Sequence, residues 1–520
     1  MRRSLTTAML TFTLLFGSGA KATTHTVKPG DDLVGVLKQL AAGDEVIVQP
    51  GTYQTSGFLE VTWKGTAQQP IVIRAATGGR PTIKGIPSEN VINIYGSFFT
   101  FKGFEITGGS HGLRLGDVDH ATFEDLLIQG NGDVGLSCNM PGKLCDALTI
   151  RKCEIHKTGG MGEGMYLGCN NAGCVFRNSV VEQNYVHDLG GAQGDGIEIK
   201  TGSYGNIVRD NVIVNANYPA ITLYGFAAGA GKKDNIVERN LIWGTVDNGI
   251  QVVGQIIVRN NIIVNAGANG IHSKASQGHD PHHVTIVNNT VYGAGNACLK
   301  TNNWSGQQSQ LAANNALYCP GKKAMDITGG APAATFAKNV VLGSVNISSG
   351  TITGASVAAD LGNPAQKVFY PPAGSKLVDA AEAKHAPADD FDGTPRPAQN
   401  VDVGAYERTG AAPKWTITFG FKGSAPPPQP DAGPGPADAA PIGDSGPAGD
   451  GPAARSDAAA SDAGVTDSGG TSVDGPSGDR SISSSSDDDG CSCRVGTPPR
   501  AGSLSPLLLL LLLAIRRRRS

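Results

Sequence analysis

A repeat unit of 21 to 32 residues fills the middle of the chain and constrains its fold more than any other feature. Each unit opens with a small residue that is followed by alternating apolar positions, as in Gly196-Ile197-Glu198-Ile199. The units that align in this way begin at Gly112, Gly135, Gly164, Gly196, Ala220, Gly249, Gly270, Ala297 and Ala324. Alternation predicts β-strands, and strands that recur at this period are typical of coils stacked in a solenoid.

A second register accompanies the later units and carries asparagine at its fourth position. These asparagines are Asn211, Asn240, Asn261, Asn289 and Asn315. In stacked coils they would lie above one another, so we expect a ladder of side-chain hydrogen bonds along the axis. Leucine-rich repeats need a leucine scaffold that is absent, and propeller blades need about 40 residues each. The pattern predicts an all-β fold, a right-handed parallel β-helix of about 10–13 coils over residues 25–410.

The two ends of this solenoid have their own sequence features. Residues 31–41 form an amphipathic pattern, and we expect an N-terminal helical cap there because a first coil exposes unpaired strand edges. Residues 401–407 are expected to form a closing coil.

Composition excludes several other classes of protein. The 72 glycines show no period of three, which excludes collagen, and long heptads are missing, which excludes a coiled coil. Positive and negative residues nearly balance in the repeat region, without the basic excess that binding to phosphates needs, so nucleic acid is not an expected partner. We expect a monomer.

Both ends of the chain have the composition of targeting segments rather than of a folded domain. Residues 1–22 join two arginines, an apolar run and small residues, which predicts a secretory signal peptide. Residues 421–490 are rich in Pro, Gly, Ala, Ser and Asp, which predicts a disordered stalk. Residues 491–520 hold two cysteines, an apolar run and four arginines, so membrane association is expected only through this segment.

Two parts of the sequence resemble known families. The segment 43–53, the run 70–75 and the ending 401–407 are similar to secreted pectin-lyase-like β-helix proteins, and the first 110 residues are most similar to the chondroitinase B and alginate lyase group. The end 491–520 resembles the C-terminal sorting tag of myxobacterial surface proteins, with a single-pass tail anchor as the alternative. These resemblances imply a location outside the cell or at its outer surface.

Cysteine usage agrees with export. Cys138 and Cys145, and likewise Cys169 and Cys174, bracket short insertions, while Cys298 and Cys319 fall in one coil. We expect three local disulfides that pin these segments and one buried thiol at Cys153. A metal site is disfavoured here because no histidine pair accompanies the cysteines.

The candidate site lies on the outer face of the strands that open each repeat. Alternation points the apolar residues inward, so the intervening polar residues stack on one outer face. An extended polymer fits beside such a face, and its substrate-binding candidates are Tyr166, Tyr224, His272 and Gln251. The plainer interpretation is a solvated face with charge pairs such as Glu198 with Lys200.

A lyase acting on uronic-acid polymers needs a base for the C5 proton and a cation for the adjacent carboxylate. Lys200 is the first candidate base, and Lys274 and Arg209 are further catalytic candidates. In the chondroitinase B and alginate lyase group, paired acids precede a Lys-Ser segment, and residues 198–211 are similar in order. The Arg-His pair that this group carries on the following coil is missing. The metal candidates, as ligands for Ca²⁺, are Glu163, Asp195 and Glu198.

The resulting function is a lyase, or a C5-epimerase, on an extracellular acidic polysaccharide. A glycoside hydrolase is an alternative, because the three acids could supply its two carboxyl groups. A non-catalytic adhesin or polysaccharide-binding surface protein is the other alternative.

Overall fold

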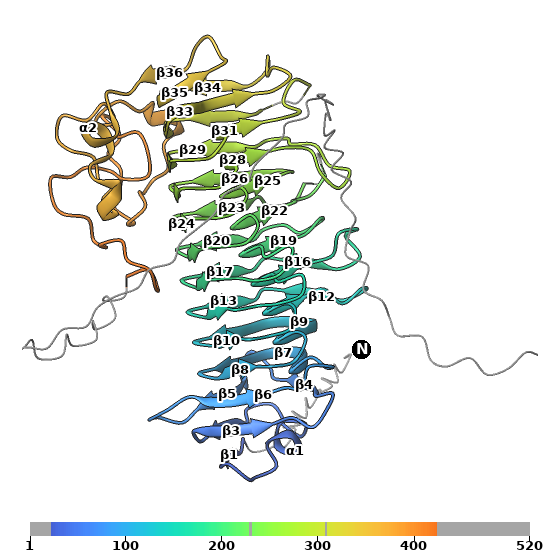
Figure 1. Ribbon diagram of the computed structural model, residues 1–520. Helices are drawn as coiled ribbons and strands as arrows, with labels where there is room; N and C mark the ends of the chain where they lie inside the picture. The colour runs from blue at the N-terminus through green and yellow to red at the C-terminus, as the bar shows by residue number, and fades with distance from the viewer. Residues whose placement is uncertain (1–21, 228–230, 307–308, 424–520) are drawn as a thin grey trace, which may run out of the picture. The chain divides into compact units, whose positions relative to one another are not determined.

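The computed structural model describes residues 22–227, 231–306 and 309–423, and these form a stack of β-coils (Figure 1). Every pairing between named strands is parallel, and the strands fall into three sheets that run along the stack. The prediction of a parallel β-helix is confirmed. The predicted signal peptide (all but its last residue), nearly all of the predicted stalk and the C-terminal segment lie outside the described residues. Within the described residues, no helix has the length and apolar character needed to cross a membrane.

Sheet 1 carries the strands that open each repeat. It consists of β4 (Glu60–Lys64), the first parts of β7 (Ile92–Lys102) and β9 (Leu113–Glu124), β11 (Leu136–Cys138), β15 (Met165–Leu167), β19 (Ile197–Ile199), β22 (Ile221–Leu223), β25 (Ile250–Val252), β28 (Asn269–Ser273), β31 (Ala297–Thr301) and the end of β33 (Ala316–Ile327).

Sheet 2 follows in each coil and begins with the first strand of the fold. It consists of β1 (Thr24–Val27), β2 (Glu45–Val48), β5 (Ile71–Ala75), the ends of β7 and β9, β13 (Thr149–Arg151), β17 (Val180–Glu182), β20 (Ile207–Arg209), β23 (Asn235–Glu238), β26 (Ile256–Arg259), β29 (Thr285–Val287), β32 (Leu311–Ala313) and β34 (Thr335–Ala337). Two further strands, β12 (Leu144–Asp146) and β16 (Val175–Arg177), pair beside it in two coils.

Sheet 3 completes each coil. It consists of β3 (Gly51–Gln54), β6 (Pro81–Lys84), β8 (Glu105–Thr107), β10 (Leu127–Gln129), β14 (Glu154–His156), β18 (Tyr185–His187), β21 (Val212–Val214), β24 (Leu241–Trp243), β27 (Ile262–Val264), β30 (Thr290–Tyr292), the start of β33, β35 (Asn339–Val345) and β36 (Thr351–Thr353).

The small residue that opens each repeat lies where neighbouring coils approach most closely. A Cβ atom built on Gly196 would lie 2.4 Å from the carbonyl oxygen of Ala220 on the next coil. The apolar residues that follow, such as Ile197 and Ile199, are fully buried in the core. Successive side chains of each strand therefore point alternately into the core and out from the coil.

The asparagine ladder is confirmed. The Nδ2 atom of Asn211 donates to the Oδ1 atom of Asn240 on the next coil, and Asn240 donates in the same way to Asn261. The ladder consists of Asn184, Asn211, Asn240, Asn261, Asn289, Asn315 and Asn339. All are fully buried. These side-chain amides also bond backbone groups: Asn211, for example, donates from Nδ2 to the carbonyl oxygen of Val181, and its own N–H group donates to the side chain of Asn240. The ladder therefore gives hydrogen-bond partners to buried backbone groups at the same turn of successive coils.

The predicted cysteine pairing is confirmed as well. Disulfides join Cys138 to Cys145, Cys169 to Cys174, and Cys298 to Cys319. Cys153 is a buried free thiol, and burial raises its pKa to about 12. The two short disulfide loops follow β11 and β15 of sheet 1 and stand beside the candidate site.

The two ends of the stack differ from expectation. A helix forms only over α1 (Leu33–Leu37), and it lies between β1 and β2 rather than before the first strand. Its Leu33 and Leu37 are buried, so one side packs on the core, while its role as a cap stays a prediction.

The expected closing coil at 401–407 is wrong. Val403 and Tyr406 pack instead against the outer face of sheet 3, in a second apolar cluster with Val212, Leu241, Ile262 and Val340. The segment 354–423 that supplies this cluster contains α2 (Val357–Leu361) and the 3₁₀ turns Pro364–Gln366 and Ala383–His385, and it lies beside the stack in Figure 1. The outer side of β21, β24 and β27 is apolar because this segment covers it.

Candidate active site

Three consecutive strands of sheet 1 build the site. Tyr166 on β15, Glu198 on β19 and Thr222 on β22 are in register, so their side chains stack on the outer face. The residues that follow two of these strands, Lys200 and Tyr224, form a second column beside the first, because the N–H group of each donates to the preceding coil. The predicted columns are therefore confirmed.

Lys200 lies at the centre of this group. Its Nζ atom donates a short hydrogen bond to Glu198 and lies 4.5 Å from the centre of the Tyr166 ring and 5.0 Å from that of Tyr224. Gly168 stands above it, and a Cβ atom at that position, where φ is +103°, would lie 3.1 Å from the Cβ atom of Lys200. The site thus holds one ammonium group between two aromatic rings and a carboxylate.

The side chains of Lys200 and Glu198 are each only 5 % exposed, so the plainer interpretation of this pair as part of a solvated face is wrong. Glu198 and Lys200 do form an ion pair, but the pair is buried on the outer face of sheet 1 rather than hydrated. Two aromatic faces predicted to stack on sugar rings contact Lys200 instead. Tyr166 is buried, which leaves Tyr224, half-buried, as the more accessible of the two rings.

Two more acids lie at the turn that precedes these strands. Glu163 and Asp195 occupy equivalent positions on consecutive coils, since each carbonyl accepts a hydrogen bond from the coil before. Both are almost fully buried, and Thr222 donates a 2.7 Å hydrogen bond to Asp195. The Oε2 atom of Glu163 is buried and has no hydrogen-bond partner among the described residues.

Burial shifts the protonation of all three acids in the same direction. It raises the pKa of Glu163 to about 8, with the negative charge of Glu198 adding to the effect. Burial and Glu198 also raise the pKa of Asp195 well above its usual range. The pKa of Glu198 is raised by burial and partly restored by Lys200 and Tyr224. Burial thus favours the protonated form of these acids beside Lys200.

Two loops meet next to Lys200. Thr201, the residue after Lys200, donates a 2.7 Å hydrogen bond to the side-chain oxygen of Gln277, whose Nε2 atom donates to Asn170 at 3.1 Å. Tyr166, whose ring contacts Lys200, also donates to Asn170, at 3.2 Å. Asn170 belongs to the loop closed by Cys169 and Cys174, so a disulfide-pinned loop and a later segment are joined beside the neighbours of Lys200.

The remaining candidates on sheet 1 lie farther along the stack. Gln251 and His272 continue the column of Glu198, and Lys274 lies beyond Val253 in the column of Lys200. His272 bonds Asn302 at 2.8 Å, and burial lowers the pKa of His272 to about 4. These residues extend the same face but do not join the Lys200 group.

Arg209 is not part of the site. It lies on β20 of sheet 2, where it pairs with Glu182 at 2.7 Å and faces Glu238 of the next coil. Acidic and basic residues alternate along this column, a favourable arrangement for cross-strand pairs. Arg177 belongs to a similar sequence run but lies on β16, outside this column, because these coils contain an extra strand.

The metal candidates adjoin one another but do not form a closed set. Glu163, Asp195 and Glu198 are close enough to shift each other's pKa values. Among the described residues, the one group of three whose ligand atoms all lie within 4.8 Å of one another is Glu154, His156 and His187. The Ca²⁺ ligands remain a prediction. Carboxylate donors and the unpartnered oxygen of Glu163 do suit a hard cation.

Sequence reasoning missed several residues that bond those of the site. Thr222 is in register with Glu198, and its bond to Asp195 gives it a role. Asn170 and Gln277 lie in loops that are 107 residues apart in the chain, so no local pattern relates them.

Family models match two overlapping parts of the chain. One is described as a Pel9A-like, right-handed β-helix region and matches residues 16–215, and the other as a right-handed β-helix region matching residues 145–316. Both agree with the observed fold.

A curated relative is pectate lyase L of Dickeya chrysanthemi, which is 24 % identical over 298 residues, or 53 % of this chain. The chain spans 63 % of the length of that relative. Solved structures that resemble the chain include pectate lyase Pel9A, with 17 % identity, a TM-score of 0.43 and coverage of 75 % of this chain and 98 % of that chain. An alginate lyase from Paenibacillus sp. str. FPU-7 has 20 % identity, a TM-score of 0.40 and coverage of 54 % and 95 %.

Proposed function

We propose that the protein is a polysaccharide lyase that cleaves a uronic-acid polymer by β-elimination, with Lys200 as the base. The observation that carries this proposal is the Lys200 ammonium group, held between Tyr166, Tyr224 and Glu198 on the outer face of a β-helix. A pectate lyase among the relatives supports the same reaction class. The proposal includes export, with which three disulfides agree.

The chemistry can be written from the residues of the site. Lys200 must first lose a proton, and Glu198 can accept it, because burial raises the pKa of that carboxyl group. The free amine then removes the C5 proton of the uronate. The electron pair of the C5–H bond forms the C4–C5 double bond, the C4–O bond breaks, and the leaving oxygen takes a proton. Lys200, now an ammonium group, can supply that proton.

Charge stabilisation at the substrate carboxylate is the second requirement. A hard divalent cation held by oxygens of Glu163, Asp195 and Glu198 would supply it, because it would neutralise the negative charge that develops at the carboxylate. Without the cation, the protonated Glu163 could donate a hydrogen bond in the same region.

Access to Lys200 is the third requirement, because its side chain is 5 % exposed. Gln277 bonds both Thr201, the residue after Lys200, and Asn170, which Tyr166 also bonds. We propose that the Gln277 segment moves away before a polymer reaches the amine. This places a conformational step before chemistry.

The experiment is an absorbance assay at about 235 nm, where the C4–C5 double bond conjugated with the carboxylate absorbs. The full chain is incubated with polygalacturonate, alginate and chondroitin, each with and without a chelator. Lys200→Ala should lower the rate by about 10²–10⁴-fold. Lys300→Ala, on the same sheet face and in register with His272, is the matched control.

Each outcome of the assay is informative. An increase in absorbance that Lys200→Ala abolishes supports the proposal. Full turnover by Lys200→Ala refutes the role of this residue, and Lys274 is then the next lysine on the same face. Reducing sugar without absorbance indicates hydrolysis, and binding without either product indicates an adhesin.

A further inference from the structure

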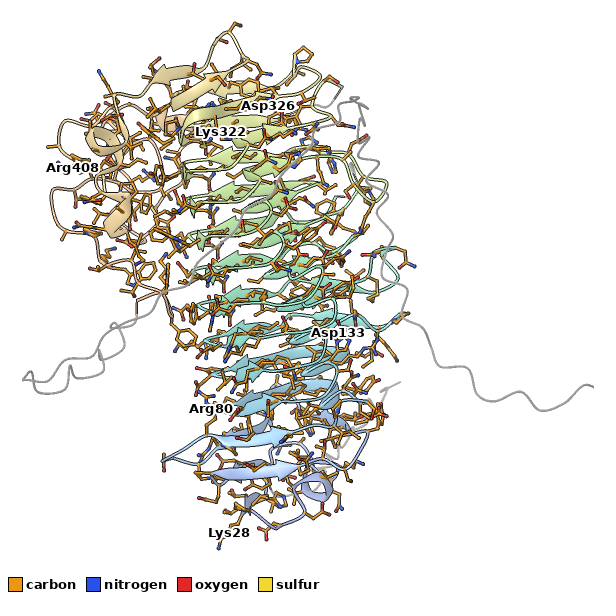
Figure 2. All side chains as sticks on the ribbon, viewed as in Figure 1. Lys28, Arg80, Asp133, Lys322, Asp326 and Arg408 are labelled. Atoms are coloured by element: carbon orange, nitrogen blue, oxygen red, sulfur yellow. A yellow bond between two sulfur atoms is a disulfide. The ribbon has the colours of Figure 1, made fainter. Side chains whose placement is uncertain are left out.

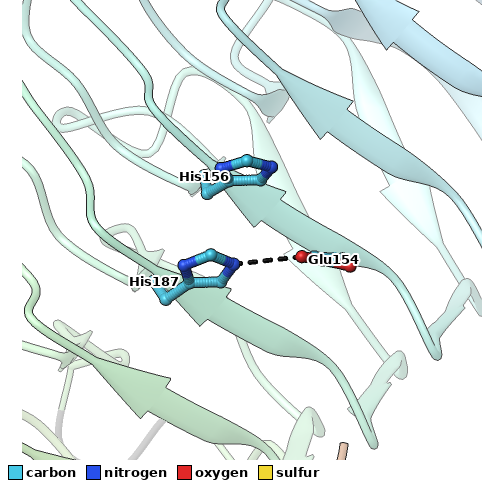
Figure 3. A group of neighbouring side chains, drawn as sticks. All are labelled: Glu154, His156 and His187. Carbon is cyan, nitrogen blue, oxygen red and sulfur yellow. Dashed lines mark hydrogen bonds and ion pairs between the residues drawn. The ribbon is translucent and has the colours of Figure 1, made fainter. Parts of the chain in front are cut away.

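Three side chains able to bind a metal ion gather on the outer face of sheet 3, on strands other than those of the Lys200 site (Figure 3). Glu154 and His156 are two positions apart on β14, so both project from the same side of the strand. His187 on β18 is in register with His156. One ligand atom from each of the three lies within 4.8 Å of the other two.

The orientation of His187 is fixed by a carboxylate behind it. Its Nδ1 atom bonds the Oδ2 atom of Asp188 at 2.8 Å, and Asn215 donates to the other oxygen of Asp188 at 2.9 Å. The Nε2 atom therefore faces Glu154, whose Oε1 atom lies 3.1 Å away. A carboxylate that orients a histidine from behind is the usual support of a histidine that binds a metal.

His156 has a ring nitrogen without a hydrogen-bond partner among the described residues. The residue is 9 % exposed, and this nitrogen, Nδ1, is buried. Its ring stacks on that of His187, with centres 4.6 Å apart and an angle of 11° between the planes. A buried polar atom without a partner destabilises the fold. Coordination by one ring nitrogen would give this imidazole the polar partner that it lacks.

We propose that Glu154, His156 and His187 form a binding site for a divalent transition-metal ion of the zinc type. Two imidazoles and one carboxylate are a zinc ligand set, whereas Ca²⁺ prefers oxygen ligands throughout. The side chain of Glu154 is 36 % exposed, which gives an ion a route from solvent. Three protein ligands leave a fourth position for water. The two rings must tilt toward each other for both nitrogens to reach the ion, and Asp188 is a positioning residue.

The test is calorimetric titration of the full chain with zinc chloride after removal of metal by a chelator. The wild-type chain should bind one more zinc ion than His187→Gln or Glu154→Gln. Asp188→Asn should retain the site with affinity lowered by about 10–100-fold. His120→Gln is the matched control, because His120 also bonds a neighbouring aspartate at 2.8 Å but belongs to no such group.

The result that overturns the proposal is equal zinc stoichiometry and affinity in the wild type and in Glu154→Gln. This variant keeps the size and shape of the side chain, and circular dichroism is the check that it folds. Binding of Ca²⁺ but not zinc by residues 154, 156 and 187 would also overturn it.

Discussion

Thr201 donates its hydroxyl hydrogen to Gln277, a residue 76 positions later in the chain and three strands farther along sheet 1. This bond and that from Gln277 to Asn170 hold the segment that we propose must move before a polymer reaches Lys200. Each hydrogen bond of this kind contributes about 0.5–1.5 kcal/mol, so the two together stabilise the closed form by a modest amount.

Gln277→Ala should therefore favour the open form. If closure limits access, the apparent affinity rises with the fraction of open molecules. We expect KM for the cleaved polymer to fall several-fold with kcat little changed, measured by the absorbance assay. Gln366→Ala, an exposed glutamine outside sheet 1, is the control. An unchanged KM would show that the Gln277 segment does not limit access.

The buried pair of Lys200 and Glu198 should show strong coupling in stability. Glu198→Gln leaves a buried ammonium group without its carboxylate, which typically costs about 3–5 kcal/mol. The double variant Lys200→Met with Glu198→Gln removes both charges and should be much closer to wild type in urea unfolding. Additive effects of the two single variants would contradict a direct buried pair.

His111 should make stability depend on pH. It is 7 % exposed, and burial lowers its pKa to about 3, an effect that Asp133, 3.6 Å away and labelled in Figure 2, does not offset. The unfolded chain gains a proton below about pH 6.5 and the folded chain does not, so stability falls as pH falls from 6.5 toward 3.

At pH 5 this group costs about 2 kcal/mol relative to pH 8. His111→Asn should reduce the loss, and His283→Gln, at an exposed histidine, should leave it unchanged. Thermal unfolding at pH 8 and pH 5 measures both. An equal pH effect in wild type and His111→Asn would contradict the assignment.

Asn261 should be among the costliest single positions of the stack. Its Nδ2 atom donates to Asn289 and to two backbone carbonyls, and its Oδ1 atom accepts from Asn240. Asn261→Leu leaves several buried polar groups without partners, at about 1–3 kcal/mol each. Asn296→Ala removes one bond at an exposed asparagine and should cost far less. Chemical unfolding that ranks the two variants equally would contradict the role of the ladder.

Much of the fold could be predicted because its determinants are periodic. The spacing of Gly164 and Gly196 aligns the strands, and once coils are aligned, Tyr166 must stand over Glu198. The disulfides could also be predicted from the sequence, because the paired cysteines lie close together in the chain: Cys169 and Cys174 have a sequence separation of only 5. Strand alignment and cysteine pairing both follow from patterns that are local in the sequence.

The errors arose where the structure departs from repetition. Arg177 shares a sequence pattern with Arg209, yet the extra strand β16 moves it out of that column. Thr201, next to Lys200, bonds Gln277, whose loop folds back to earlier coils. The position of residues 401–407 is set by packing against sheet 3. The sequence of a short segment without repeats does not indicate which surface of the protein it packs against.

The segment 354–423 also changes how the solenoid comes apart. Coils in a repeat protein contact only their neighbours, so each can in principle unravel alone. Phe369, Phe391 and Tyr406 belong to one apolar cluster with strands from β21 to β35, and none of these coils can leave without detaching the segment. The C-terminal half should therefore unfold as one cooperative unit. The coils from β1 to β17 contribute no buried residue to this cluster and are free to fray from the N-terminal end.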